Sequence, residues 1–118
     1  MNGSIRYSHG ELERMIGARE NQAAEDLATI RLLEREWDDY RHVMRENSAR
    51  YEDAGTAIGA ANYFVQKGLA ARRELDRYVG RLADEQEELF TEAAREIRST
   101  SETELERLRT EKAGASWA

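Results

Sequence analysis

Ala54-Gly55-Thr56-Ala57-Ile58-Gly59-Ala60-Ala61 is the stretch that decides the fold of this chain, which has 118 residues and no proline. It lies near the middle of the chain and consists of small residues with weak hydrophobic patterning. Glycine costs about 1 kcal/mol relative to alanine inside a helix, so Gly55 and Gly59 favour a chain reversal. We predict a turn at about residues 54–61. The alternative is that the glycines only kink one continuous helical rod.

The residues before this stretch have the pattern of one long helix, expected at about residues 8–53. Ser8 and Glu11 match a capping box, in which the serine hydroxyl accepts a hydrogen bond from the glutamate amide. Apolar side chains then recur at seven-residue steps, which is typical of a coiled coil. The members of this stripe are Ile16, Ala23, Ile30, Trp37, Met44 and Tyr51, with Leu12, Leu33, Tyr40 and Ala54 at intermediate positions.

The residues after the glycine-bearing stretch predict a second helix, at about residues 62–112. Its apolar positions are Phe64, Val65, Leu75, Val79, Leu82, Leu89, Ala93, Ile97, Leu105 and Leu108. Several hydroxyl side chains follow one another after Ile97, so we expect a break at about residues 99–103. The tail, residues 113–118, is expected to be disordered when free.

Two such helices fit together as an all-α, long antiparallel two-helix coiled-coil hairpin, a single domain over residues 1–118. Folding the chain back at the predicted turn would place Trp37 beside Tyr78 and Leu12 near Leu105. The aromatic residues gather in the half nearest the turn, which should therefore hold the best core. The open end, where Leu12 meets Leu105, is where we expect a partner to complete the fold.

Charged residues support this antiparallel pairing. In the predicted register one acidic group faces one basic group across the hairpin, whereas a parallel arrangement offers no such match. The two groups are Glu34, Glu36, Asp38 and Asp39 on the first helix and Arg72, Arg73, Arg77 and Arg81 on the second. Polar residues inside the stripe usually lower stability while they specify the register, and here they are Arg19, Asp26 and Asn47.

Composition excludes several classes of partner. The formal net charge is -6, so nucleic acid is not an expected partner. The chain has no cysteine, which excludes disulfides and thiolate metal sites. We find neither an apolar run of membrane-spanning length nor the apolar core of a signal peptide, so no membrane is expected as a partner. The expected location is the cytoplasm, with export alongside a partner as the alternative.

The sequence contains no recognisable active site, and we expect neither an enzyme nor a cofactor. Asp39 and His42 have the spacing of a carboxylate and histidine in di-iron bundles, but such sites need further inward ligands that the chain lacks. A solvated helix face is the preferred interpretation of this pair. The acidic residues between Asp84 and Glu92 lack a glycine-containing loop that would shape a calcium site. No metal is therefore expected.

A binding role is suggested by apolar residues that fall outside the seven-residue stripe. The candidates are Leu27, Leu69, Phe90 and Ile97, which would form a second apolar face on a fold too thin to bury two. Trp117, near the C-terminus, is either incidental or an anchor that becomes ordered on binding. The predicted partner is a helical protein.

Two segments carry a resemblance to a known family. They are Leu33-Glu34-Arg35-Glu36-Trp37-Asp38-Asp39-Tyr40 and Leu82-Ala83-Asp84-Glu85-Gln86-Glu87-Glu88-Leu89-Phe90. The stretch from Leu32 to Leu108 resembles the small α-helical proteins encoded beside LXG toxins of the type VIIb secretion system. The resemblance implies a targeting factor or chaperone that binds the helical N-terminal domain of a toxin, with a second small helical protein as a further partner. The Trp-x-Gly turn of the wider secreted hairpin superfamily is missing.

Two other functions fit the same pattern. The first is a self-assembling structural protein, as in phage or appendage components, in which two hairpins form a four-helix bundle. The second is a secretion chaperone of a flagellar or type III kind, which shares the hairpin shape and differs in its partner. A weak homodimer is compatible with the adaptor function, whereas a tight dimer favours assembly.

Overall fold

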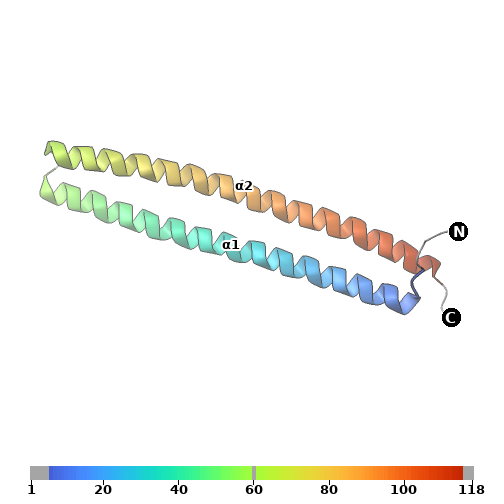
Figure 1. The fold of residues 1–118 in the computed structure, drawn as a ribbon. Helices are drawn as coiled ribbons and strands as arrows, with labels where there is room; N and C mark the ends of the chain where they lie inside the picture. Colours follow the sequence, from blue (N-terminus) through green and yellow to red (C-terminus); the bar gives the residue numbers. More distant parts are fainter. Residues whose placement is uncertain (1–5, 60, 116–118) are drawn as a thin grey trace. The chain divides into compact units, whose positions relative to one another are not determined.

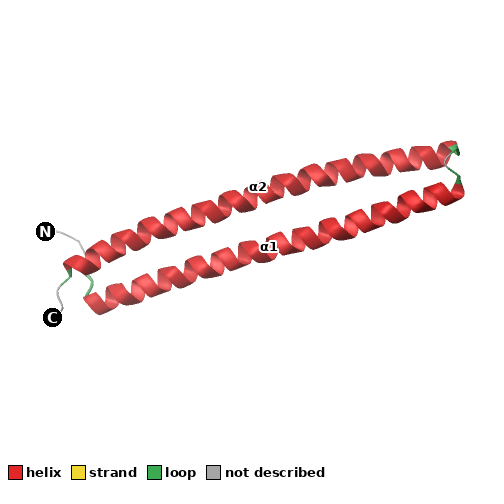
Figure 2. Cartoon of the chain, turned by 180° about the vertical axis from the view of Figure 1, so that it is seen from behind, coloured by secondary structure: helices red, strands yellow, loops and turns green. Residues whose placement is uncertain are grey.

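The computed structural model describes residues 6–59 and 61–115. It contains two long helices, α1 (His9–Ile58) and α2 (Tyr63–Gly114). Figure 1 shows them joined by a short connection and running in opposite directions. Within the described ranges there is no strand, as Figure 2 shows. The predicted all-α antiparallel helical hairpin is therefore confirmed.

The capping box at the start of α1 forms much as predicted. The Glu11 amide donates a hydrogen bond to Ser8 Oγ at 3.1 Å, and the Leu12 amide donates to the Ser8 carbonyl at 3.0 Å. The Glu11 carboxylate accepts from the Ser8 hydroxyl at 3.0 Å instead of reaching back to the serine amide. Ser8 thus satisfies amide groups that the first turn of a helix leaves without partners.

The turn is shorter than predicted and lies later in the chain, between Ile58 and Tyr63. Our prediction of a turn at residues 54–61 is wrong in its first half, because α1 continues through Gly55. The reason is packing across the hairpin: a Cβ atom on Gly55 would lie 3.1 Å from the methyl carbons of the buried Leu69. This glycine permits a close approach of the two helices and does not break α1.

Gly59 and Asn62 end one helix and begin the next. The Gly59 amide donates to the Gly55 carbonyl at 3.1 Å, and Gly59 has a φ of 129°, a conformation that favours glycine. The Asn62 side-chain oxygen accepts hydrogen bonds from the amides of Phe64 and Val65, at 2.9 and 3.3 Å. Asn62 is therefore the N-cap of α2.

The backbone conformation at Gly59 leads to a test with a matched control. We expect Gly59→Ala to lower the free energy of unfolding by about 1–2 kcal/mol, because alanine is strained at positive φ. Gly80→Ala should instead raise it by up to about 1 kcal/mol, since Gly80 is inside α2 and a Cβ atom there meets nothing within 4 Å. Urea unfolding followed by circular dichroism measures both. Changes of the same sign would contradict this explanation of the turn.

The hairpin, which we predicted as one domain, divides into two compact units. Unit 1 comprises Met1–Arg31 and Glu92–Ala118, and unit 2 comprises Leu32–Thr91. Unit 1 pairs the first part of α1 with the last part of α2, and unit 2 pairs the two segments next to the turn.

Unit 1 contains the better core. Leu12 and Leu108 are 1% and 2% exposed, and Leu105, Ala94 and the polar Ser101 are also buried. The prediction that the best core lies nearest the turn is therefore wrong. The open end does not present Leu12 and Leu105 as an uncovered surface, because each is enclosed within unit 1.

The break predicted at residues 99–103 is absent, since α2 runs through this segment. The hydroxyl-bearing side chains are compatible with a continuous helix for two reasons. The Thr103 hydroxyl donates to the Ser99 carbonyl at 3.0 Å, and Ser101 is small enough to occupy a buried inward position. Small side chains allow two helices to pack closely, so this polar run does not end the helix. Residues 113 and 114 are also helical, whereas the rest of the predicted tail lies largely outside the described residues.

Ion pairs flank the core of unit 1. Lys112 Nζ lies 3.0 Å from Glu13 Oε1, and a guanidinium nitrogen of Arg109 lies 3.8 Å from Glu20 Oε1. The hydrogen bond and charge of Lys112 hold the pKa of the Glu13 carboxyl below its usual value. These pairs lie at the surface, where solvent screens them, so their net contribution to stability is small.

Unit 2 is held together by a different set of inward residues. Leu69 and Ala83 are buried, but much of the inward row is polar, with Glu34, Arg41 and Ser48 half-buried on α1. Trp37 and Met44 of the predicted stripe are half-buried, but at the intermediate positions the inward residues of α1 lie one position later than predicted, at Glu34 and Arg41. Several predicted stripe residues are exposed instead: Leu33, Tyr40, Tyr51 and Ala54.

The predicted register of unit 2 is also wrong. Trp37 shares a surface hollow with Phe90 and does not lie beside Tyr78, which is exposed. Arg72 contacts Ser48 and Arg73 contacts Glu52, so the arginines do not meet the acidic residues at 34–39. The later turn explains the direction of the shift, because each α1 residue meets a residue further along α2.

Candidate partner-binding surface

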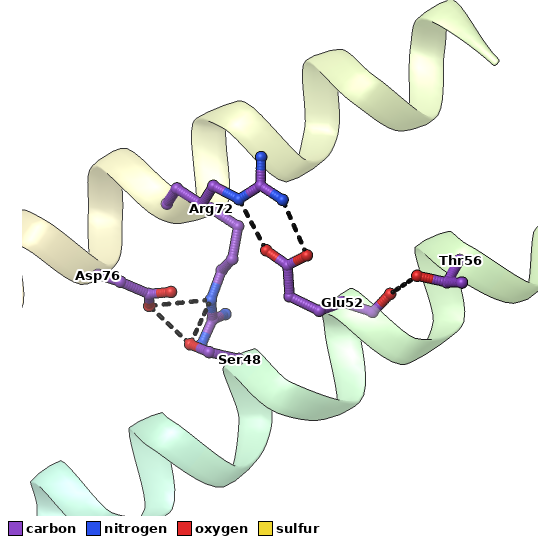
Figure 3. A network of polar contacts seen from close by, with 6 residues as sticks. Ser48, Glu52, Thr56, Arg72 and Asp76 are labelled. Carbon is purple, nitrogen blue, oxygen red and sulfur yellow. Dashed lines mark hydrogen bonds and ion pairs between the residues drawn. The ribbon is translucent and has the colours of Figure 1, made fainter. Parts of the chain in front are cut away.

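A polar network connects the helices inside unit 2. The Ser48 hydroxyl donates to Asp76 Oδ1 at 2.7 Å and accepts from two Arg72 nitrogens at 3.2 Å, as Figure 3 shows. Arg72 Nε also lies 3.3 Å from the Asp76 carboxylate. Each of these half-buried groups therefore has a partner of opposite charge or hydrogen-bonding type. The network joins the helices where the inward row lacks large apolar side chains.

Further ion pairs lie along one side of unit 2. Arg73 donates two hydrogen bonds to the Glu52 carboxylate, at 2.9 and 3.0 Å. The Arg41 guanidinium lies 3.9 Å from both Asp84 and Glu87. On α2, three residues of these ion pairs each come directly after a residue that faces α1. They are Arg73, Asp84 and Glu87. We call this side of unit 2 the ion-pair flank.

Large apolar side chains lie on both helices on the side of unit 2 opposite the ion-pair flank. They directly precede inward residues: Leu33 and Tyr40 precede Glu34 and Arg41 on α1, and three leucines at seven-residue steps do the same on α2. The leucines are Leu75, Leu82 and Leu89, which precede Asp76, Ala83 and Phe90. Tyr40 is 49% exposed, Leu75 45% and Leu89 60%.

These positions lie on the same side of the helix pair. Seen from one end, residue numbers advance clockwise around one right-handed helix and anticlockwise around its antiparallel partner. Positions that precede the inward row therefore project to one side in both helices. A contact agrees with this: a Cβ atom on Gly68, which precedes Leu69, would lie 3.2 Å from the Tyr51 hydroxyl. Tyr51 is thus also on this side, together with the exposed Val43.

We call this surface the apolar flank of unit 2. It consists of six exposed side chains and one half-buried side chain, Leu82; the exposed ones are Leu33, Tyr40, Val43, Tyr51, Leu75 and Leu89. Among the described residues, Tyr7 is the one large hydrophobic side chain outside Leu32–Thr91 that is exposed. A contiguous exposed apolar surface is typical of a site that binds another protein.

The residues predicted from sequence to bind a partner do not form this surface. Leu69 is 4% exposed and belongs to the core of unit 2. Leu27 and Ile97 in unit 1, and Phe90 in unit 2, are half-buried. The prediction of an uncovered second face at these positions is therefore wrong for Leu69, which faces Gly55 across the hairpin. Trp117 lies outside the described residues.

The side chains whose spacing resembles that of metal ligands form ordinary ion pairs or lie exposed. His42 Nε2 lies 3.2 Å from Glu46 on an exposed face of α1, and Asp39 is exposed nearby. Within residues 6–59 and 61–115, no group of three or more His, Asp or Glu side chains is placed to hold a metal ion. In the acidic stretch of α2, Asp84 and Glu87 pair with Arg41, and Glu92 pairs with Arg95 at 2.8 Å.

Comparison of the chain with models of protein families, with curated proteins and with solved structures finds no match. None of the helices in the described ranges is both long enough and apolar enough to cross a membrane.

Sequence reasoning missed the apolar flank although a signal was present. Leu75, Leu82 and Leu89 repeat every seven residues, and hydrophobic periodicity predicts that such a repeat forms the core of the hairpin. The residues that face α1 belong to a second seven-residue repeat, one position later: Leu69, Asp76, Ala83 and Phe90. This repeat is less apolar than the leucine repeat because it contains an aspartate and an alanine. Arg72, which pairs with Asp76, lies one helical turn before it. The two residues form a polar site with Ser48 between the helices.

Proposed function

We propose that this protein is a non-catalytic adaptor that binds a helical partner protein. The observation that carries this proposal is the apolar flank of unit 2, where tyrosine, valine and leucine side chains remain exposed on two adjacent helices. Burial of such side chains supplies about 25 cal/mol per Å² of apolar area, and an unpartnered flank leaves that free energy unused. A helix is the expected form of partner because the flank runs lengthwise along two neighbouring helices, whose side chains form ridges and grooves that another helix can pack into.

The resemblance to proteins encoded beside LXG toxins suggests the class of partner. By this proposal the chain binds the helical N-terminal domain of such a toxin and targets it for export through the type VIIb system. Binding would cover apolar surface on both proteins until export. A second small helical protein completes the assembly.

The direct test is sedimentation velocity of the purified chain, alone and mixed with the N-terminal domain of an LXG toxin encoded beside it. We expect a monomer or weak dimer alone, and a stable complex in the mixture. A tight dimer at low micromolar concentration, with no binding to the toxin domain, would instead favour the self-assembling structural protein. A complex with a flagellar or type III substrate, and none with the toxin domain, would favour the other chaperone class.

A further inference from the structure

We propose that the apolar flank of unit 2 receives an amphipathic helix whose apolar stripe is bordered by basic residues. This inference rests on the proposed function, because it assumes a helical protein partner. It adds the location of the contact and the charge of the partner.

The border of the apolar flank on α1 is predominantly acidic. Glu36 and Arg50 lie seven residues on either side of Val43 and so continue its row along the helix. The next row outward holds Asp39, Glu46 and Asp53. Four carboxylates thus accompany one guanidinium along this edge. On α2, Glu85 lies seven residues after the exposed Tyr78 and adds a carboxylate to the other edge.

Most of these carboxylates have no cationic nitrogen within 4 Å in the described part of unit 2. Glu46 lies near His42, but no ion pair involves Glu36, Asp39, Asp53 or Glu85 in the described structure. On the ion-pair flank, by contrast, Arg41 and Arg73 lie within 4 Å of acidic side chains. Several carboxylates without an ion-pair partner therefore border the apolar flank of unit 2. Oppositely charged edges on a partner would complement it and would guide the partner to this side.

The same charges disfavour a second copy of the chain as the occupant. A two-fold axis along the helices would place the acidic edge of α1 over the edge of α2 that carries Glu85. A two-fold axis across the helices would place the acidic edge of α1 over itself. Both arrangements bring carboxylates together as the apolar side chains are buried, and like charges at an interface reduce affinity. A partner helix with lysine or arginine at its edges has no such penalty.

The test uses the full chain and two synthetic helical peptides that share one leucine stripe. One peptide carries lysine beside the stripe and the other carries glutamate at the same positions. We expect the lysine peptide to bind, measured by fluorescence anisotropy, and the glutamate peptide to bind at least tenfold more weakly. Raising the salt concentration should reduce this difference. Equal binding of the two peptides would overturn the charge assignment.

Matched variants locate the contact. Leu75→Ser removes a side chain of the apolar flank and should weaken binding of the lysine peptide at least tenfold, whereas Ala70→Ser, directly after the inward Leu69, should leave it unchanged. Asp39→Lys should weaken binding of the lysine peptide and strengthen that of the glutamate peptide. Asp38→Lys is its control, because Asp38 lies beside Arg41 in the hollow on the ion-pair flank. All four positions are exposed, so circular dichroism should show unchanged helicity.

The remaining outcomes separate this inference from the proposed function. If the toxin domain binds and Leu75→Ser has no effect on it, the adaptor function stands and the location on the apolar flank is wrong. If Leu75→Ser converts a tight dimer of the chain into a monomer, the occupant is a second copy and the basic helix is excluded. If the lysine peptide binds as predicted but the toxin domain does not, the surface assignment stands and the partner class fails.

Discussion

Replacement of Leu108 by alanine is expected to lower the free energy of unfolding by about 2–5 kcal/mol, the usual cost of a buried leucine. Leu108 is 2% exposed and lies in unit 1, and together with Leu12, at 1%, it is one of the two most completely buried large side chains of the described structure. Truncation would leave a cavity that two rigid helices can close only in part. Urea unfolding followed by circular dichroism measures the change.

Leu89→Ala is the matched control, because it removes the same atoms from a side chain that is 60% exposed. Its expected effect on the free energy of unfolding is within about 0.5 kcal/mol. Similar losses for the two variants would mean that Leu89 is covered, and would contradict both the assignment of the core and that of the apolar flank.

Replacement of Arg19 by methionine should have the opposite effect and raise the free energy of unfolding by about 1–2 kcal/mol. Arg19 occupies an inward position in unit 1, and its Nε atom is buried without a hydrogen-bond partner. A buried donor without an acceptor carries a desolvation cost of about 1–3 kcal/mol, and methionine retains an apolar stem of similar length. The same unfolding experiment measures the gain.

Arg14→Met provides the comparison, since Arg14 is exposed and should change the free energy of unfolding by less than about 0.5 kcal/mol. Removal of Arg19 also removes one of the positive charges that hold the pKa of the Glu104 carboxyl below its usual value, but the larger cause, the hydrogen bond from Arg107, remains. A loss of stability in Arg19→Met would show that the guanidinium has a partner in solution.

The sequence was sufficient to predict the two helices and their antiparallel arrangement, because these depend on local features. Ser8 and Glu11 mark the start of α1, and the absence of proline allows both helices to continue. The end of α1 was harder to place. Gly55 and Gly59 are alike in sequence, but Gly55 packs against Leu69 whereas Gly59 adopts a positive φ. Only the tertiary structure distinguishes a packing glycine from a turn glycine.

The candidate surface was harder to predict than the fold. In unit 2 the inward row contains Arg41, Ser48 and Asp76, whose ion pairs and hydrogen bonds join residues more than twenty positions apart. Hydrophobic periodicity assigns such residues to the outside and assigns Leu75 and Leu89 to the core. The row that faces the other helix and the exposed row are adjacent in sequence. An error of one position therefore assigns exposed residues to the core and core residues to the surface. Leu69 was misassigned for this reason.

The location of the better core also bears on how the chain folds. Unit 1 joins segments from opposite ends of the sequence, as the contact between Lys112 and Glu13 shows. Closing so long a loop carries a large entropic cost, and the leucines that repay it come together only after the closure. Pairing that starts at the turn gains mainly polar contacts at first. We therefore expect the rate of folding to depend on the helices forming early, and Leu108→Ala to act mostly by accelerating unfolding.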